Sequence, residues 1–149
     1  MLAIVIAAAI TVQVVWFRPR PTRVASPPSA STAAPVPVTG KLRNVTRDSA
    51  MTRLGADGWT ISYNATNPSQ SFDQTTLSGW KDGGTLVVNV AIYDTHSDDM
   101  PKVVKDSFPN PERWVTEADG RRVLGVTVID QRNVAARKEA ERVFELLTR

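Results

Sequence analysis

The residue types best suited to chemistry lie in one short stretch, YDTHSDDMP at residues 93–101, which holds the only histidine of the chain. Asp94, His96 and Asp98 alternate there, so in an extended segment their side chains would point to the same side. An imidazole and two carboxylates can bind a divalent metal ion, which makes a small metal-assisted hydrolase one hypothesis. Zinc takes about three or four protein ligands and harder cations about six oxygens, so a further carboxylate would have to approach. The candidates for this are Asp73, Asp82, Asp119 and Asp130.

The same stretch is also explained as a junction between a strand and a helix, and this is the interpretation we favour. A strand would end near Tyr93, and Ser97, Asp98 or Asp99 would cap the helix that follows. Pro101 would stand in the first helical turn, where its missing N–H costs nothing. Because a cap typically contributes ~1 kcal/mol, the acidic residues have a structural explanation that needs no ligand.

Other catalytic signatures are absent from the sequence. It contains no cysteine, no G-x-S-x-G motif, no glycine-rich phosphate loop and no H-E-x-x-H motif. We therefore expect a protein that is not an enzyme and that uses no cofactor.

Five segments alternate between apolar and polar residues, as half-buried strands do. They lie at residues 59–64, 75–80, 85–93, 113–117 and 122–130. Asp-Gly pairs at residues 82–83 and 119–120 separate neighbouring strands, and Asp-Gly accepts the positive φ of a tight hairpin turn. The sequence therefore predicts a mainly antiparallel sheet of about five strands.

Three amphipathic segments predict helices that cover this sheet. They lie at residues 47–58, 100–108 and 133–147. Asp48 or Ser49 is the expected N-cap of the first, and Asn133 that of the last. One-sided strands and one-sided helices together predict a small two-layer α+β domain with a C-terminal helix.

The sheet is expected to have one apolar face and one polar, mostly uncharged face. In the first strand, Trp59, Ile61 and Tyr63 would point to the apolar side. The residues expected on the polar side are Thr60, Ser62, Asn64, Asn89, Ala91, Tyr93 and Thr127. A solvated face of this kind is ordinary in antiparallel sheets, and the alternative is a binding face.

Four residues are the candidates for contacting a partner through that face, namely Tyr93, Asn89, Trp80 and Trp114. Both tryptophans precede hairpin turns, where packing at a sheet edge or in the core explains them. An exposed tryptophan would favour binding instead.

The first 17 residues contain no charged side chain and predict a transmembrane anchor, with an uncleaved signal sequence as the alternative description. Trp16 and Phe17 would lie at the membrane interface. Arg18, Arg20 and Arg23 would contact anionic lipid headgroups. Residues 18–40, rich in Pro, Ala and Ser, predict an extended, disordered linker, and residues 41–149 a globular domain.

The net charge of +3 comes from the residues beside the predicted anchor. From Gly40 onward, fifteen Lys and Arg balance fifteen Asp and Glu. A nucleic-acid-binding domain needs a basic surplus of its own, so no nucleic-acid partner is expected.

Two features disagree about the side of the membrane on which the domain lies. The arginines after the apolar segment favour a cytoplasmic domain by the positive-inside rule, whereas the proline-rich linker is typical of envelope proteins. We favour an extracytoplasmic domain on a single-pass anchor in the cell membrane. This layout predicts a non-enzymatic binding or assembly domain of the cell envelope with a protein partner, and a cytoplasmic membrane-tethered regulator is the alternative.

Overall fold

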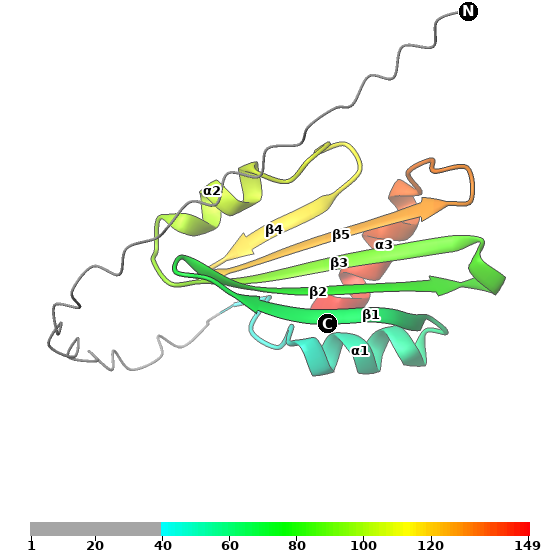
Figure 1. Ribbon diagram of the computed structural model, residues 1–149, viewed down its shortest axis with the longest axis horizontal. Coiled ribbons are helices and arrows are strands. Elements are labelled where there is room, and N and C mark those ends of the chain that lie inside the picture. Colours follow the sequence, from blue (N-terminus) through cyan, green and yellow to red (C-terminus); the bar gives the residue numbers. More distant parts are fainter. Residues whose placement is uncertain (1–39) are drawn as a thin grey trace, which may run out of the picture. The chain divides into compact units, whose positions relative to one another are not determined.

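The computed structural model describes residues 40–149 (Figure 1), so the predicted anchor and nearly all of the predicted linker lie outside the described residues. The described part is a small α+β domain with a five-stranded antiparallel sheet of order β1-β2-β3-β5-β4 and a C-terminal helix. The strands are β1 Thr60–Pro68, β2 Phe72–Lys81, β3 Leu86–Thr95, β4 Val115–Asp119 and β5 Arg122–Asp130. The fold class predicted from the alternating pattern is therefore confirmed.

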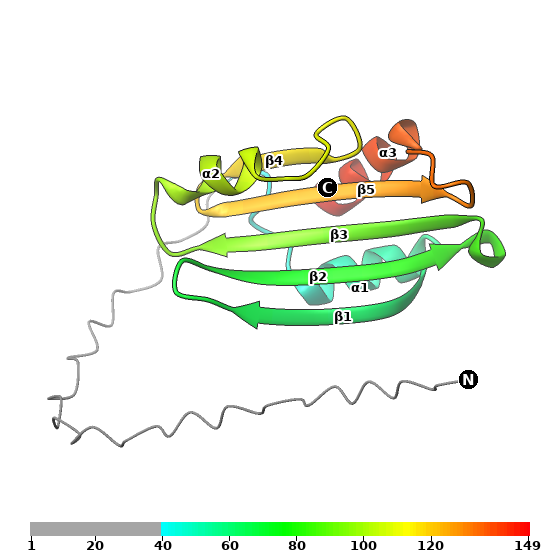
Figure 2. The same ribbon diagram turned by 45° about the horizontal axis from the view of Figure 1, so that its top comes forward.

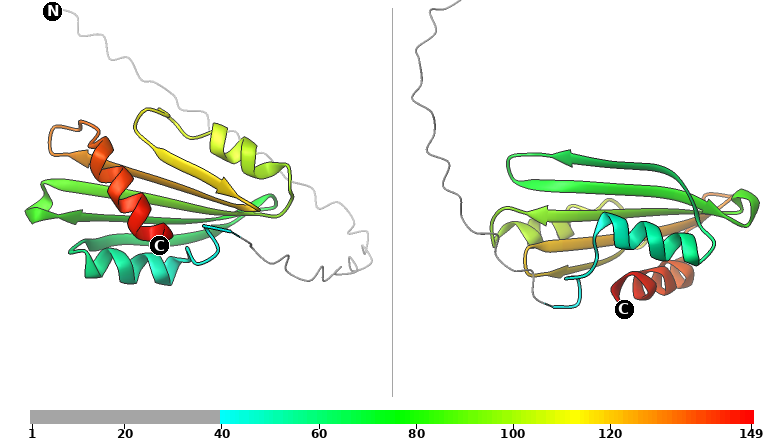
Figure 3. Two further views of the ribbon diagram at one scale, coloured as in Figure 1. Left: turned by 180° about the vertical axis from the view of Figure 1, so that it is seen from behind. Right: turned by 90° about the horizontal axis from the view of Figure 1, so that it is seen from below.

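The helices lie on both faces of the sheet rather than on one. They are α1 Arg47–Ala56, α2 Met100–Asp106 and α3 Arg137–Thr148, and a 3-10 turn, η1, occupies Asp82–Gly84. Helices α1 and α3 cover one face (Figure 3), whereas α2 covers one end of the opposite face (Figure 2). The predicted two-layer arrangement therefore holds for α1 and α3 but not for α2.

The main core lies between the sheet and the pair α1 and α3. Strand residues of one face interdigitate with residues of both helices and of the segment before α1. The buried members are Leu42, Val45, Ala50, Leu54, Trp59, Leu77, Val88, Val90, Ile92, Leu124, Val126, Val128, Ala140, Val143, Phe144 and Leu147. Because burying one large aliphatic side chain contributes about 1.5–3 kcal/mol, this layer supplies most of the driving force for folding.

A second, smaller cluster explains why α2 packs on the other face. Ala91 and Val123 make that end of the face apolar, and Val104 and Phe108 from α2 and the residues after it pack on them. A side chain at Gly125 would overlap the Phe108 ring, so glycine lets the ring approach the sheet backbone. The sequence predicted that this face is solvated, but α2 covers one end of it.

A bulge in β1 changes which side chains face the core. Ile61 pairs with Gly79 and Tyr63 pairs with Ser78, so Ser62 is an extra residue without a partner. Since strand side chains alternate, the extra residue turns Tyr63 away from the core, where the sequence had placed it. Asn64 pairs with Leu77, a core residue, so Asn64 moves to the core side of the sheet edge.

Two helix starts differ from the predicted ones. The N-cap of α1 is Thr46 rather than Asp48 or Ser49, and Thr46 and Ser49 form a reciprocal capping box. Helix α3 begins after Ala136, whereas Asn133 lies in the preceding turn with a φ of 61°. The backbone N–H of Ala136 donates to Val128, which holds this segment to the sheet until the helix starts.

Candidate functional site

The histidine stretch is the junction between β3 and α2. The strand ends at Thr95 and the helix begins at Met100, as the favoured interpretation predicted. Asp99 occupies the N-cap position but its side chain makes no capping hydrogen bond. Pro101 stands in the first turn and is buried.

The three predicted metal ligands are each engaged with a different partner. Asp94 accepts a hydrogen bond from Arg122 at 2.6 Å, and Asp98 accepts one from Arg121 at 2.6 Å. The Nδ1 atom of His96 lies 3.1 Å from the carbonyl oxygen of Gln70, and its Nε2 atom lies 3.5 Å from a carboxylate oxygen of Asp73. The pKa of Asp98 is lowered, first by the hydrogen bond from Arg121 and then by its charge.

The described residues contain no group of three or more His, Cys, Asp or Glu side chains that could hold a metal ion. Of the four further carboxylates considered as ligands, Asp73 approaches His96, and Asp119 instead accepts from the backbone N–H of Leu42 at 3.0 Å. The metal-assisted hydrolase therefore stays a hypothesis, and these positions give it no support.

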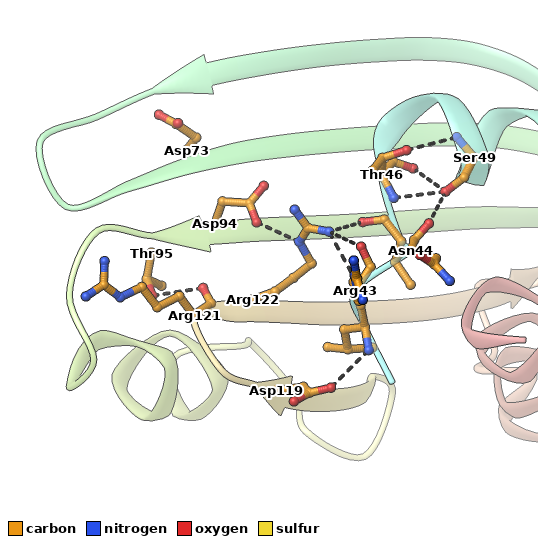
Figure 4. Close-up of polar contacts among 12 residues, drawn as sticks. Arg43, Asn44, Thr46, Ser49, Asp73, Asp94, Thr95, Asp119, Arg121 and Arg122 are labelled. Atoms are coloured by element: carbon orange, nitrogen blue, oxygen red, sulfur yellow. Dashed lines mark hydrogen bonds and ion pairs between the residues drawn. The ribbon is translucent and has the colours of Figure 1, made fainter. Parts of the chain in front are cut away.

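Arg122 organises the polar contacts at this end of the sheet (Figure 4). Its side chain is only 11% exposed and donates to Asp94 on one side. On the other side it donates to the carbonyl oxygens of Leu42, Arg43 and Val45, at 3.3, 3.2 and 2.9 Å. These contacts hold the segment before α1 against the sheet, so Asp94 and Arg122 have a structural role.

A second polar cluster surrounds Asp57, just after α1. Its carboxylate accepts from Trp59 Nε1 at 3.0 Å, from Lys81 Nζ at 3.3 Å and from Arg142 Nη1 at 2.9 Å. Hydrogen bonding from Arg142, helped by Lys81, lowers the pKa of Asp57 from 3.8 to about 2, although partial burial opposes the shift. The pKa of Arg142 is raised, first by Glu139 and then by Asp57. This cluster joins α1, β2 and α3.

Two of the four candidate binding residues belong to the cluster under α2. The Tyr93 and Phe108 rings pack edge to face at 5.6 Å, and Trp114 packs on Phe108 at 5.0 Å between ring centroids. Tyr93 also accepts a hydrogen bond from Gln74, and burial raises the pKa of its hydroxyl. Packing therefore accounts for Tyr93 and Trp114.

Helix α2 leaves the other end of this face uncovered (Figure 2). The strand register places the other two candidates, Trp80 and Asn89, at that end. Two rows of strand neighbours make up this part, which we call the open face. It consists of Tyr63, Ser78 and Asn89 in one row and Trp80, Val87 and Ile129 in the next. None of the six side chains is charged.

Two large aromatic side chains stand exposed on the open face. Tyr63 is 53% exposed and Trp80 is 43% exposed. Between them and β5, the Ser78 hydroxyl donates to Asn89 Oδ1 at 2.7 Å. The next residue of that row, Thr127, has a buried hydroxyl that finds no hydrogen-bond partner within residues 40–149. Sequence reasoning missed Tyr63, because the bulge at Ser62 has no signature in the alternating pattern.

The fold and these surfaces define a small α+β domain with one half-covered sheet face that carries exposed aromatics. Comparison of the chain with models of known protein families, with curated proteins and with solved structures found no match. Each helix within residues 40–149 is too short or too polar to cross a membrane.

Proposed function

We propose that this protein is a non-enzymatic binding domain of the cell envelope, held at the membrane by its first 17 residues, and that the open face binds a protein partner. The observation that carries the proposal is the exposure of Tyr63 and Trp80 in neighbouring rows of two adjacent strands. Single exposed apolar residues are common on protein surfaces, but two large aromatics on one uncharged sheet face are not.

The composition of the open face fits the centre of a protein interface. Tyr and Trp are enriched in interfaces and dominate their binding energy, and charged residues are depleted from interface centres. The half-buried Ser78–Asn89 pair supplies an amide group that hydrogen-bonds to the partner beside the aromatic anchors. A charge-free surface would give little electrostatic steering, so we expect the affinity to come from burial of the rings.

The membrane part of the proposal rests on composition. Residues 1–17 are uncharged, and Trp16 and Phe17 precede Arg18, Arg20 and Arg23, an order that suits the change from hydrocarbon to headgroups. The linker up to Gly40 would then hold the domain away from the bilayer, on the extracytoplasmic side, where it acts as an accessory or assembly subunit.

A site-specific photo-cross-linker tests the open face. Benzoylphenylalanine placed at Trp80 in the full chain, in its native cells, is expected to give a discrete adduct with a partner protein. The matched control is Val103 on α2, which is 57% exposed and lies off the open face. Equal adducts at both positions, or none at Trp80, would contradict a binding role for this face.

A reporter fused after Arg149 tests the placement of the domain. We expect a reporter that works only outside the cytoplasm to be active, and one that works only in the cytoplasm to be silent. The opposite pattern would replace the envelope proposal with the cytoplasmic membrane-tethered regulator.

A further inference from the structure

Strand β1 is one of the two edges of the sheet. Within residues 40–149 it pairs only with β2, and α1 lies behind the sheet rather than alongside β1 (Figure 2). Its nine residues, TISYNATNP, carry no charge and are all exposed or half-buried. An edge of this kind presents unpaired backbone N–H and C=O groups that can extend the sheet.

The opposite edge, β4, is protected in the ways that proteins usually use. It has only five residues, and two of them, Glu117 and Asp119, are acidic. Arg137 donates to the carbonyl oxygen of Trp114 at 2.7 Å, just before β4, and Leu42 binds Asp119 at its far end. Within residues 40–149, β1 has neither the charge nor the cover that β4 has.

Only part of β1 is suited to pairing. The bulge at Ser62 and the proline at Pro68 interrupt its two ends, and both irregularities oppose strand addition. Between them, residues 63–67 pair with β2 without a shift in register. A regular segment of five residues therefore remains open to another strand.

We propose that this segment pairs antiparallel with the same segment of a second copy of the chain, about a two-fold axis perpendicular to the sheet. In such a pair each residue faces the residue equally far on the other side of the axis, so a charge at or beside the axis would meet the same charge of the second copy. Residues 63–67 contain none. Pockets or charged residues beside a sheet edge usually select a foreign peptide. Segment 63–67 has no charged residue that could select one.

The two-fold axis has a consequence for the open face. A rotation about an axis perpendicular to the sheet keeps the same face outward in both copies. The two open faces would then lie on the same side of the joined sheet, with the two Tyr63 residues on its two central strands and on opposite sides of the axis. The inference goes beyond the proposed function and does not depend on it, because the pairing needs only β1.

The size of the contact sets its strength. A standard stable interface buries about 800 Å² on each partner, and pairing of a five-residue segment buries less. We therefore expect an association that depends on protein concentration rather than a permanent dimer.

The absence of cysteine from the chain makes the test direct. Single cysteines are introduced in the full-length protein, one at a time, by Tyr63→Cys, Asn64→Cys, Ala65→Cys, Thr66→Cys and Asn67→Cys. A disulfide needs Cα atoms within about 7 Å, so under mild oxidation only positions nearest the two-fold axis should cross-link. We expect the yield of disulfide-linked homodimer to peak at one of the five positions and fall at least fivefold two residues away.

Two controls define the background. Val103→Cys on α2 and Thr116→Cys on β4 report random collisions, and both should cross-link at least fivefold less than the peak position. A flat profile over residues 63–67, or a yield equal to that of the controls, overturns the proposal. Capture of a different protein at these positions, without the homodimer, also overturns it.

A charge placed in the edge provides a second measurement. Asn64→Lys added to Ala65→Cys, which is at the midpoint of the segment and so nearest the axis, would set two lysines close together across the axis, and we expect at least a tenfold loss of homodimer. Val103→Lys in the same background should leave the yield unchanged. Circular dichroism of both variants confirms folding, and an unchanged yield in a folded Asn64→Lys protein contradicts pairing through β1.

Discussion

At the scale of single residues, Asp57 is the carboxylate with an unusually large number of polar partners. It receives hydrogen bonds from Trp59, Lys81 and Arg142, which come from three different parts of the chain. These contacts lower the pKa of Asp57 because they favour its charged form in the folded domain. By linkage, the charged Asp57 therefore stabilises the folded state.

Replacing Asp57 by Asn should lower the free energy of unfolding by about 1 kcal/mol at neutral pH, a modest loss because solvent screens the partly exposed pairs. The pKa of Asp57 is near 3.8 when the chain is unfolded and about 2 in the folded domain. Its contribution is therefore fully present above pH 3.8 and is lost as the pH falls towards 2. Urea unfolding at several pH values should show the difference between wild type and Asp57→Asn shrinking over that window.

Asp48→Asn is the matched control for this experiment. The side chain of Asp48 is 85% exposed and pairs only with its neighbour Arg47 among the described residues, and such surface pairs contribute little. If Asp48→Asn lost as much stability at neutral pH as Asp57→Asn, the Asp57 cluster would have no special role.

At the scale of elements, Arg122 fastens the segment before α1 to the sheet. The segment that leads into α1 offers three carbonyl oxygens to one guanidinium, and the capping box of Thr46 and Ser49 then starts the helix (Figure 4). The helix itself buries few residues, Ala50 and Leu54 being the buried ones within it. Its position therefore depends strongly on this polar attachment.

Arg122→Met should lower the free energy of unfolding by roughly 3 kcal/mol, because it keeps the aliphatic stem but leaves Asp94 and part-buried carbonyl groups without their donor. Chemical denaturation followed by far-ultraviolet circular dichroism measures the change. Arg132→Met is the control, since the Arg132 side chain is 84% exposed and, among residues 40–149, pairs only with Asp130 in its own turn. A loss below about 1 kcal/mol for Arg122→Met would contradict the structural role given to this residue.

At the scale of the whole molecule, the two faces of the sheet differ in what their aromatic residues do. Trp59 is buried between the sheet and the helices, whereas Trp80 stands partly exposed on the open face. The same residue type therefore stabilises the fold at one position and is free for contact at the other.

We expect Trp59→Ala to lower the free energy of unfolding by about 3–5 kcal/mol and Trp80→Ala by less than about 1 kcal/mol. The first change leaves a cavity in the core and removes the donor to Asp57, and the second removes a half-solvated ring. Denaturant unfolding of both variants measures the contrast. Similar losses at the two sites would mean that Trp80 is a packing residue rather than an interface residue.

Much of the fold could be predicted because its signals are local. The alternation in residues 85–93 and 122–130 depends only on neighbouring side chains, and so do the Asp-Gly turns, where Asp82 and Gly83 do take positive φ. The Glu139–Arg142 pair, at 2.7 Å, is local in the same way, because residues three apart on one helix are neighbours on its surface.

The candidate site was predicted less well, because it depends on residues far apart in the sequence. Nothing near Tyr63 marks the bulge that turns it outward, and nothing near Trp114 or Tyr93 shows that Phe108 will pack between them. Likewise, Asp94 is as suitable a metal ligand as any aspartate until Arg122 is placed beside it by the pairing of β3 with β5.

By itself, then, the sequence determined the strands, the hairpins, the charge balance of the domain and the junction around His96, since each follows from residues within a few positions of one another. Only the tertiary structure decided which carboxylates are already engaged by arginines, which end of the polar face α2 covers, and which aromatics remain exposed. Those features depend on register and on packing between elements, and a one-residue bulge or a single glycine such as Gly125 is enough to change them.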